Sequence, residues 1–295
     1  MAHKPSLRPH HRVGEALRAI ARDALAEGRD ALTDPHRSDT VAVHDFRKAM
    51  KRWRALLRML APILEERGQR LRHEARDRVR PLNEARDAQA AIDALADLGD
   101  AVSPRSIATM TARLEERRRV AENAVITPQL RADLVRWIDT LASDIEEWPV
   151  DAATYADVAD RLTTIYWRVR QLIPSDWAHA EPEALHELRK RVVDHRYQMD
   201  WLEPVWPRLG RLWVEEAQRL RTRLGEHCDL VVLRKLTEPH QLLAPWRSRL
   251  TPLIVQRQAT KRAAAARLAG RLFAERPKNF RRRLDALWEN AEHRV

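Results

Sequence analysis

Hydrophobic and basic residues follow a helical period along Val43–Arg58. At about 100° per residue, Phe46, Met50, Trp53 and Leu57 fall on one side of a helix. No acidic residue interrupts the other side between positions 47 and 58, although alternating charges are usual on a solvated helix face. We therefore expect a helix whose apolar face packs in a bundle and whose basic face points outward. The basic face consists of His44, Arg47, Lys48, Lys51, Arg54 and Arg58.

Prolines divide the rest of the chain into segments of helical length. A proline inside a helix destabilises it by roughly 3 kcal/mol, so each proline indicates a helix end. The segments predict helices at about residues 11–31, 38–61, 64–81, 84–98, 104–124, 127–147, 152–172, 182–203, 206–225, 228–237, 249–275 and 278–293.

The composition agrees with an all-α fold. Seven glycines, three tyrosines and three phenylalanines in 295 residues are too few for a twisted sheet and its turns. Alanine, leucine, arginine and glutamate predominate instead, and these residues favour helices.

The chain also contains an internal repeat, which appears when it is shifted by 142 residues. The shift aligns the basic stretch with a second one at Leu185–Asp200, without a gap, and continues into the following segments. This predicts two homologous helical-bundle halves, residues 1–148 and 149–295, packed around an approximate two-fold axis. The aligned pairs include His44 with His186, Arg47 with Arg189, Lys48 with Lys190, Arg54 with Arg196, Pro62 with Pro204 and Asp87 with Asp229.

The second basic stretch carries less charge than the first. Val193 and Asp200 stand where the first copy has Lys51 and Arg58, and His195 falls on the apolar side, where we expect a packed core residue. Its basic arc consists of His186, Arg189, Lys190, Arg196 and Tyr197. Weaker basic stripes occur at Arg72, Arg76 and Arg80 and at Arg257 and Lys261, whereas glutamates partly offset the run Arg117–Arg119.

The charge balance narrows the classes of partner. Lysine and arginine exceed aspartate and glutamate by 11, which favours polyanions: nucleic acid, an anionic membrane surface or inorganic polyphosphate. The single cysteine, Cys228, excludes an intramolecular disulfide and a thiolate zinc cluster, and we expect it to be buried. No apolar run reaches the roughly 18–20 residues of a membrane helix, and the basic N-terminus lacks the apolar core of a signal peptide. We expect a cytoplasmic protein without membrane partner, metal or cofactor.

The paired motifs resemble those of the CHAD family, named for a conserved histidine α-helical domain. The matching segments are VHDFRKAMKRWRALL with LNEARDAQAAIDAL, and LHELRKRVVDHRYQM with LGEHCDLVVLRKL. The resemblance implies two helical-bundle halves that bind inorganic polyphosphate, without catalysis, through basic residues lining a central groove or pore. It also suggests association with polyphosphate granules.

The resemblance assigns roles to particular residues. The family histidines fall on His44 and His186, and its basic positions on Arg47, Lys48, Lys51, Arg54, Arg189, Lys190 and Arg196. If the histidines bind as cations, affinity should increase as the pH falls through about 6.5–7. Arg86, Asp87 and Asp229 match a second motif, for which we expect a structural role, with each aspartate paired to an arginine.

Two alternatives remain open. A nucleic-acid-binding protein would need aromatic side chains beside the basic arc for base stacking, and only Tyr197 lies there; competition between polyphosphate and DNA distinguishes the two functions. A metal-dependent phosphohydrolase is suggested by the pair His44–Asp45 and by Glu183 with His186, but neither stripe carries clustered carboxylates. Loss of polyphosphate with Mg²⁺ or Mn²⁺, abolished by substitution of His44 or Asp45, would support the hydrolase.

Overall fold

The computed structural model describes residues 4–125 and 127–293, and this part of the chain is all-helical without strands. The predicted all-α class is therefore confirmed. The α-helices are α1 (Val13–Thr33), α2 (Asp39–Met59), α3 (Ala61–Val79), α4 (Asn83–Asp97), α5 (Pro104–Val125), α6 (Pro128–Asp144), α7 (Tyr155–Gln171), α8 (Pro182–Leu202), α9 (Pro207–Leu236), α10 (Arg247–Leu272) and α11 (Pro277–Glu292). Short 3-10 helices include η1 (Arg80–Leu82) and η4 (Glu203–Val205).

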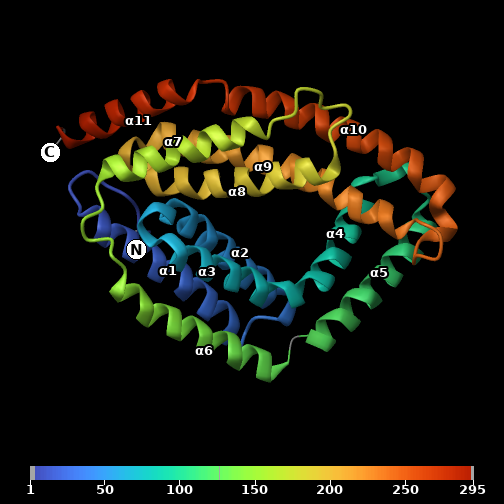
Figure 1. Ribbon diagram of the computed structural model, residues 1–295. Coiled ribbons are helices and arrows are strands. Elements are labelled where there is room, and N and C mark those ends of the chain that lie inside the picture. Colours follow the sequence, from blue (N-terminus) through green and yellow to red (C-terminus); the bar gives the residue numbers. More distant parts are fainter. Residues whose placement is uncertain (1–3, 126, 294–295) are drawn as a thin grey trace.

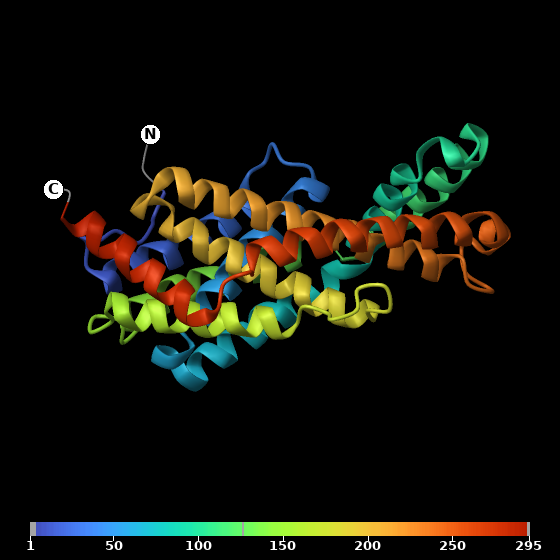
Figure 2. The same ribbon diagram turned by 90° about the horizontal axis from the view of Figure 1, so that it is seen from above.

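The helices form two connected groups. In Figure 1, α1, α2 and α3 lie below α7, α8 and α9, while α10 and α11 run along the top and α6 along the lower left. α4 and α5, with the adjoining ends of α9 and α10, form an extension on the right, which Figure 2 shows from above. α2 packs against α1, α3 and α8, and α4 packs against α5 and α9. α9 thus contacts elements of both groups.

Two hydrophobic clusters hold these groups together. The larger cluster contains residues of α1, α2, α3, α6, α7, α8 and α11, and its largest fully buried side chains include Trp53, Trp148 and Trp201. The smaller cluster lies in the extension and joins Leu95 of α4 and Leu114 of α5 to Leu233 of α9. Both clusters take residues from both sides of position 148, so both span the boundary between the two predicted halves.

The long helix α9 differs from the prediction. We expect two helices, at 206–225 and 228–237, but α9 continues through this region as one helix of 30 residues. In the first copy, Pro81 lies in η1, which separates α3 from α4. The 142-residue shift places Arg223 at the corresponding position, and an arginine does not interrupt a helix.

α2 has the predicted division into an apolar and a basic face. Phe46 and Trp53 are fully buried, and the Trp53 ring centroid lies 5.5 Å from that of Trp148. The expectation that the basic face points outward holds for His44 and Lys48, which are exposed, but part of this side of α2 packs against α8. Gln198 Nε2 donates a hydrogen bond to the Ala55 carbonyl oxygen at 3.4 Å, and Tyr197 Oη donates one to that of Lys48 at 3.4 Å.

His195, Cys228 and Tyr197 are buried. His195 is 3% exposed, as the apolar side of its helix predicts, and burial lowers its pKa to about 4. Cys228 is also buried, as expected. Tyr197 is only 5% exposed and belongs to the larger hydrophobic cluster, although the helical period places it in the basic arc. No helix in the described ranges is long and apolar enough to cross a membrane.

Candidate functional site

Five cations from four helices meet where α2, α4, α8 and α9 come together. They are Arg47 and Lys51 of α2, Arg86 of α4, Arg189 of α8 and Arg221 of α9. We call them the central cluster. Two carboxylates, Asp87 and Asp229, accompany these five cations. The cluster therefore has an excess of positive charge.

Burial and mutual repulsion disfavour the charged forms of these side chains. Burial, together with the positive charges of Arg189, Arg47, Arg221 and Arg86, lowers the pKa of Lys51 from 10.5 to about 7. Burial, with the charge of Arg86, lowers the pKa of Arg47 to about 10. Burial, followed by the charge of Arg86, lowers the pKa of Arg189, and burial, followed by the charge of Arg196, lowers the pKa of Arg221. An anion bound here would relieve the repulsion.

Two close contacts position the arginines of the central cluster. Arg47 Nη1 donates a hydrogen bond to Asn83 Oδ1 at 2.9 Å. Arg189 lies against Gly225, where a Cβ atom would come within 3.3 Å of the guanidinium Nε and Nη2 atoms. The 142-residue shift that aligns Arg47 with Arg189 also aligns Asn83 with Gly225. Asn83 and Gly225 thus lie against two arginines that are related by the same shift.

Arg86 connects the two carboxylates of the central cluster. Its Nη1 donates to Asp87 Oδ1 at 3.0 Å, and its Nη2 donates to Asp229 Oδ1 at 2.9 Å. The expected pairing of these aspartates with an arginine is therefore observed. Burial raises the pKa of Asp229, and the charges of Arg86 and Arg189 oppose this rise. The ion pairs fix the side chain of Arg86 between α4 and α9.

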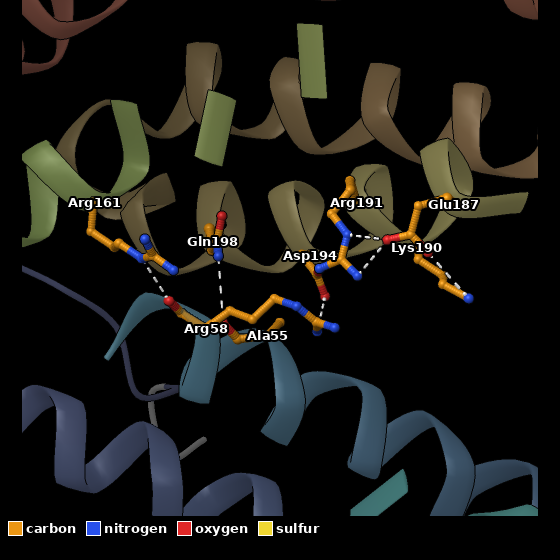
Figure 3. Close-up of polar contacts among 8 residues, drawn as sticks. All are labelled: Ala55, Arg58, Arg161, Glu187, Lys190, Arg191, Asp194 and Gln198. Atoms are coloured by element: carbon orange, nitrogen blue, oxygen red, sulfur yellow. Dashed lines mark hydrogen bonds and ion pairs between the residues drawn. The ribbon is translucent and has the colours of Figure 1, made fainter. Parts of the chain in front are cut away.

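A second group of cations lies further along α2, around a buried carboxylate. Asp194 is 4% exposed and accepts from Arg58 Nη1 at 3.2 Å and from Arg191 Nη1 at 2.8 Å (Figure 3). Burial raises the pKa of Asp194, and the charges of Arg58, Arg191 and Arg54 oppose this rise. Arg72 is close enough to Arg191 and Asp194 for their charges to affect its own pKa. We call Arg54, Arg58, Arg72, Arg191 and Asp194 the Asp194 cluster.

Further contacts hold the Asp194 cluster in place. Arg161 Nε donates to the Arg58 carbonyl oxygen at 2.8 Å, next to the Gln198–Ala55 contact that ties α8 to α2 (Figure 3). Glu187 accepts from Arg191 Nε at 2.8 Å and from Lys190 Nζ at 3.2 Å. In the described part of the chain, Arg54 Nε is buried without a hydrogen-bond partner, as is Arg189 Nε in the central cluster.

The structure brings together only part of the predicted set. Six predicted residues belong to the two clusters: Arg47, Lys51 and Arg189 to the central cluster, and Arg54, Arg58 and Arg72 to the Asp194 cluster. Exposed side chains flank them, namely those of His44, Lys48, Arg76, Arg80, His186 and Lys190. Burial lowers the pKa of His186, and the charges of Lys190 and Arg189 lower it further.

Three predicted residues are not members of the two clusters. Arg196 borders the central cluster, because its charge lowers the pKa of Arg221, and its guanidinium lies over the ring of the buried Tyr197, 4.2 Å from the centroid. Lys261 Nζ lies 2.8 Å from Asp97 Oδ1 and 3.0 Å from Glu226 Oε2, and Arg257 also faces Asp97. These carboxylates neutralise the stripe predicted on α10.

The sequence did not identify Arg191 or Arg221 as site residues, and for Arg86 it indicated only a structural role. A usable signal for Arg221 was its spacing from Gly225 and Asp229, at i+4 and i+8, which places all three on one helix face. Within the described ranges, no group of three or more histidine, cysteine, aspartate or glutamate side chains is arranged to hold a metal ion.

The fold and site define an all-helical protein in which cations from four helices gather around few carboxylates. The chain belongs to the CHAD family, because the family model for the CHAD domain matches residues 15–238. The crystal structure of the CHAD domain from the plant Ricinus communis has a similar fold, with a TM-score of 0.57 at 18% sequence identity. The similarity covers 100% of this chain and 96% of that chain. No curated protein matches the sequence.

Proposed function

We propose that the protein binds inorganic polyphosphate, without catalysis, along a basic groove formed by the central cluster and the Asp194 cluster. Arg47, Lys51, Arg54 and Arg58 follow one side of α2 over about 16 Å, at 1.5 Å of rise per residue. Such a row of cations suits a linear polyanion. Membership of the CHAD family supports this ligand, since polyphosphate is the polyanion that the family resemblance implies.

The excess positive charge of the central cluster carries the proposal. Lys51 has a pKa of about 7 because it is partly buried among four arginines without a carboxylate of its own. Guanidinium groups form bidentate contacts to phosphate oxygens, and lysine acts as a point charge. A bound phosphate chain would supply the missing negative charge.

We infer a pH dependence of binding from Lys51 rather than from His186. Since a polyanion favours the charged form of Lys51, binding takes up a proton, and affinity should decrease as the pH rises through about 7. Burial and the nearby cations lower the pKa of His186, so this histidine is largely neutral in the free protein near pH 7.

We also infer that the groove lies between two homologous halves, residues 1–148 and 149–295. Asn83 contacts Arg47, and Gly225 contacts Arg189. The same 142-residue shift relates the two pairs, which favours this duplication. The first copy contributes more charge, since Val193 and Asp200 occupy the positions of Lys51 and Arg58. Binding in the cytoplasm, at polyphosphate granules, would fit this activity.

The surroundings of the clusters favour polyphosphate over nucleic acid. A protein that binds single strands without sequence preference offers exposed aromatic rings for base stacking. The sequence places Tyr197 of α8 in the basic arc and Trp53 on the apolar side of α2. Tyr197 is 5% exposed, and Trp53 is 0% exposed. Their rings therefore cannot stack on bases.

A competition experiment tests the proposal. Labelled long-chain polyphosphate is bound to the protein and displaced with unlabelled polyphosphate or with single-stranded DNA at the same phosphate concentration. We expect polyphosphate to compete at least about tenfold better, a difference of about 1.4 kcal/mol. Equal competition by DNA would contradict the assignment of the ligand.

Matched variants test the assignment of the site. The double variant Lys51→Gln with Arg189→Gln should weaken polyphosphate binding by about 100-fold or more. The reason is that each charged hydrogen-bonding group contributes about 1.5–3 kcal/mol. Lys278→Gln with Arg282→Gln, at exposed positions of α11, removes the same two charges outside the clusters and should change affinity less than threefold. Equal losses in both variants would show that only the net charge matters.

A further inference from the structure

A separate pocket of about 350 Å³ lies between α9, α10 and the segment at 178–182 that leads into α8. His227, Val231 and Arg234 of α9 line one wall, and Gln258 and Arg262 of α10 line another. Its size lies at the lower end of the range for small-molecule sites.

The pocket is on the other side of α9 from the central cluster. Gly225 and Asp229 face Arg189 and Arg86. His227 lies two residues from each of them, which is about 200° around the helix. A ligand in the pocket would therefore not occupy the polyphosphate groove, so the site is independent of the proposed function.

Polar groups in the pocket wall lack partners within the described residues. His227 is 2% exposed, and its Nδ1 atom is buried without a hydrogen bond. Arg262 Nε is also buried and unpaired. Gln258 is 6% exposed, and no hydrogen bond of its amide occurs in the described ranges. Since an unsatisfied buried polar group is costly, such groups indicate a ligand or ordered water.

The charges of the pocket favour an anion. Arg234 and Arg262 form no ion pair with any carboxylate of the described chain, and Glu181 is the one acid in the wall. Glu181 is the N-cap of α8, and the helix N-terminus adds partial positive charge at this side. Ala178, Ala180 and Val231 supply apolar surface next to these groups.

We propose that this pocket binds a small phosphorylated molecule, a phosphate monoester. Arg234 and Arg262 bind the phosphate, and Gln258 and His227 complete the polar contacts. The remaining volume and the alanine and valine side chains accommodate the organic part. Free orthophosphate and the end of a polyphosphate chain share the phosphate chemistry but lack this organic part.

The ring signals of His227 provide a direct test. Protein with ¹⁵N-labelled histidine is titrated with ribose 5-phosphate, orthophosphate or ribose, and His227→Gln identifies the resonance of His227. We expect a saturable shift with ribose 5-phosphate, at least about tenfold weaker binding of orthophosphate, and no shift with ribose at roughly 10 mM. Absence of a shift with ribose 5-phosphate would overturn the proposal, and equal affinity for orthophosphate would overturn the inferred organic part.

Variants separate this pocket from the groove. Arg234→Gln with Arg262→Gln should weaken the binding of ribose 5-phosphate by about tenfold or more and leave polyphosphate affinity within threefold. Lys51→Gln should have the opposite effects. If the double variant retains its thermal transition and still binds ribose 5-phosphate with full affinity, the two arginines do not form the site. If short polyphosphate shifts the His227 signal in the Lys51→Gln variant as strongly as ribose 5-phosphate does, the pocket instead takes the end of the chain.

Discussion

Replacement of Lys51 by methionine should make the free protein more stable and weaken its binding of polyphosphate. Methionine keeps the length of the side chain and removes its charge. Lys51 lies among Arg47, Arg189, Arg221 and Arg86, and burial is the largest cause of its low pKa. The charge therefore opposes folding in the absence of a ligand.

The size of this effect follows from the two pKa values of Lys51. The pKa is 10.5 in the unfolded chain and about 7 in the folded protein, and each pH unit between them is worth about 1.4 kcal/mol. The upper limit at pH 7 is thus about 4 kcal/mol, and because Lys51 is only partly buried we expect a gain of about 1–3 kcal/mol in Lys51→Met.

The pH dependence has a defined sign. Between pH 7 and 10.5, the unfolded chain holds a proton on Lys51 that the folded protein has released, so the stability of the original protein rises with pH. The advantage of Lys51→Met should be largest at or below pH 7 and should shrink as the pH approaches 10.

Urea unfolding at pH 6, 7, 8 and 9.5 measures the free energy of unfolding, and calorimetric titration measures polyphosphate affinity. Lys48→Met, at an exposed position of the same helix, is the control and should change stability by less than about 0.5 kcal/mol. A Lys51→Met variant that is destabilised, or whose advantage does not vary with pH, would refute the reasoning.

Three further outcomes are expected. Gly225→Ala places a methyl group 3.3 Å from the Arg189 guanidinium and should lower polyphosphate affinity about threefold to tenfold in calorimetric titration, while the better helix propensity of alanine maintains stability. Asp194→Asn leaves Arg58 and Arg191 without their buried carboxylate, which should lower stability by about 2–4 kcal/mol. In thermal melts, polyphosphate should raise the stability of this variant by more than it raises that of the original protein. Polyphosphate affinity should fall with salt, with a log–log slope of about −3 to −4 for five neutralised phosphates, and this slope should be smaller by nearly one in Lys51→Met.

The sequence predicted the order of the helices and the two faces of α2 well. Periodicity reports which side chains share a face, and for Phe46, Trp53, Arg47 and Lys51 it sorted them correctly. It does not report what the face contacts. Part of the basic face of α2 packs against α8, where Gln198 donates to the Ala55 carbonyl oxygen, while His44 and Lys48 are exposed as expected.

Long-range pairing explains the other differences between prediction and structure. Lys261 belongs to a basic stripe in the sequence, but Asp97 and Glu226, from two other helices, neutralise it. Arg221 has no basic counterpart in the first repeat, where Val79 stands at the matching position, so the repeat could not identify it. The spacing within a single helix carries no information about such partners.

The unbroken helix α9 has a mechanical consequence. It is about 45 Å long at 1.5 Å per residue. Leu220 and Leu224 anchor it in the larger hydrophobic cluster, and Leu230 and Leu233 anchor it in the smaller one. The parallel connection through α3 and α4 is interrupted at Arg80–Leu82. α10 also joins the two clusters, through Ala265 and Ala269 in the larger one and Leu250 and Ile254 in the smaller one. The two helices therefore act as rigid rods that transmit force between the clusters, and bending of the extension relative to the rest must deform both of them.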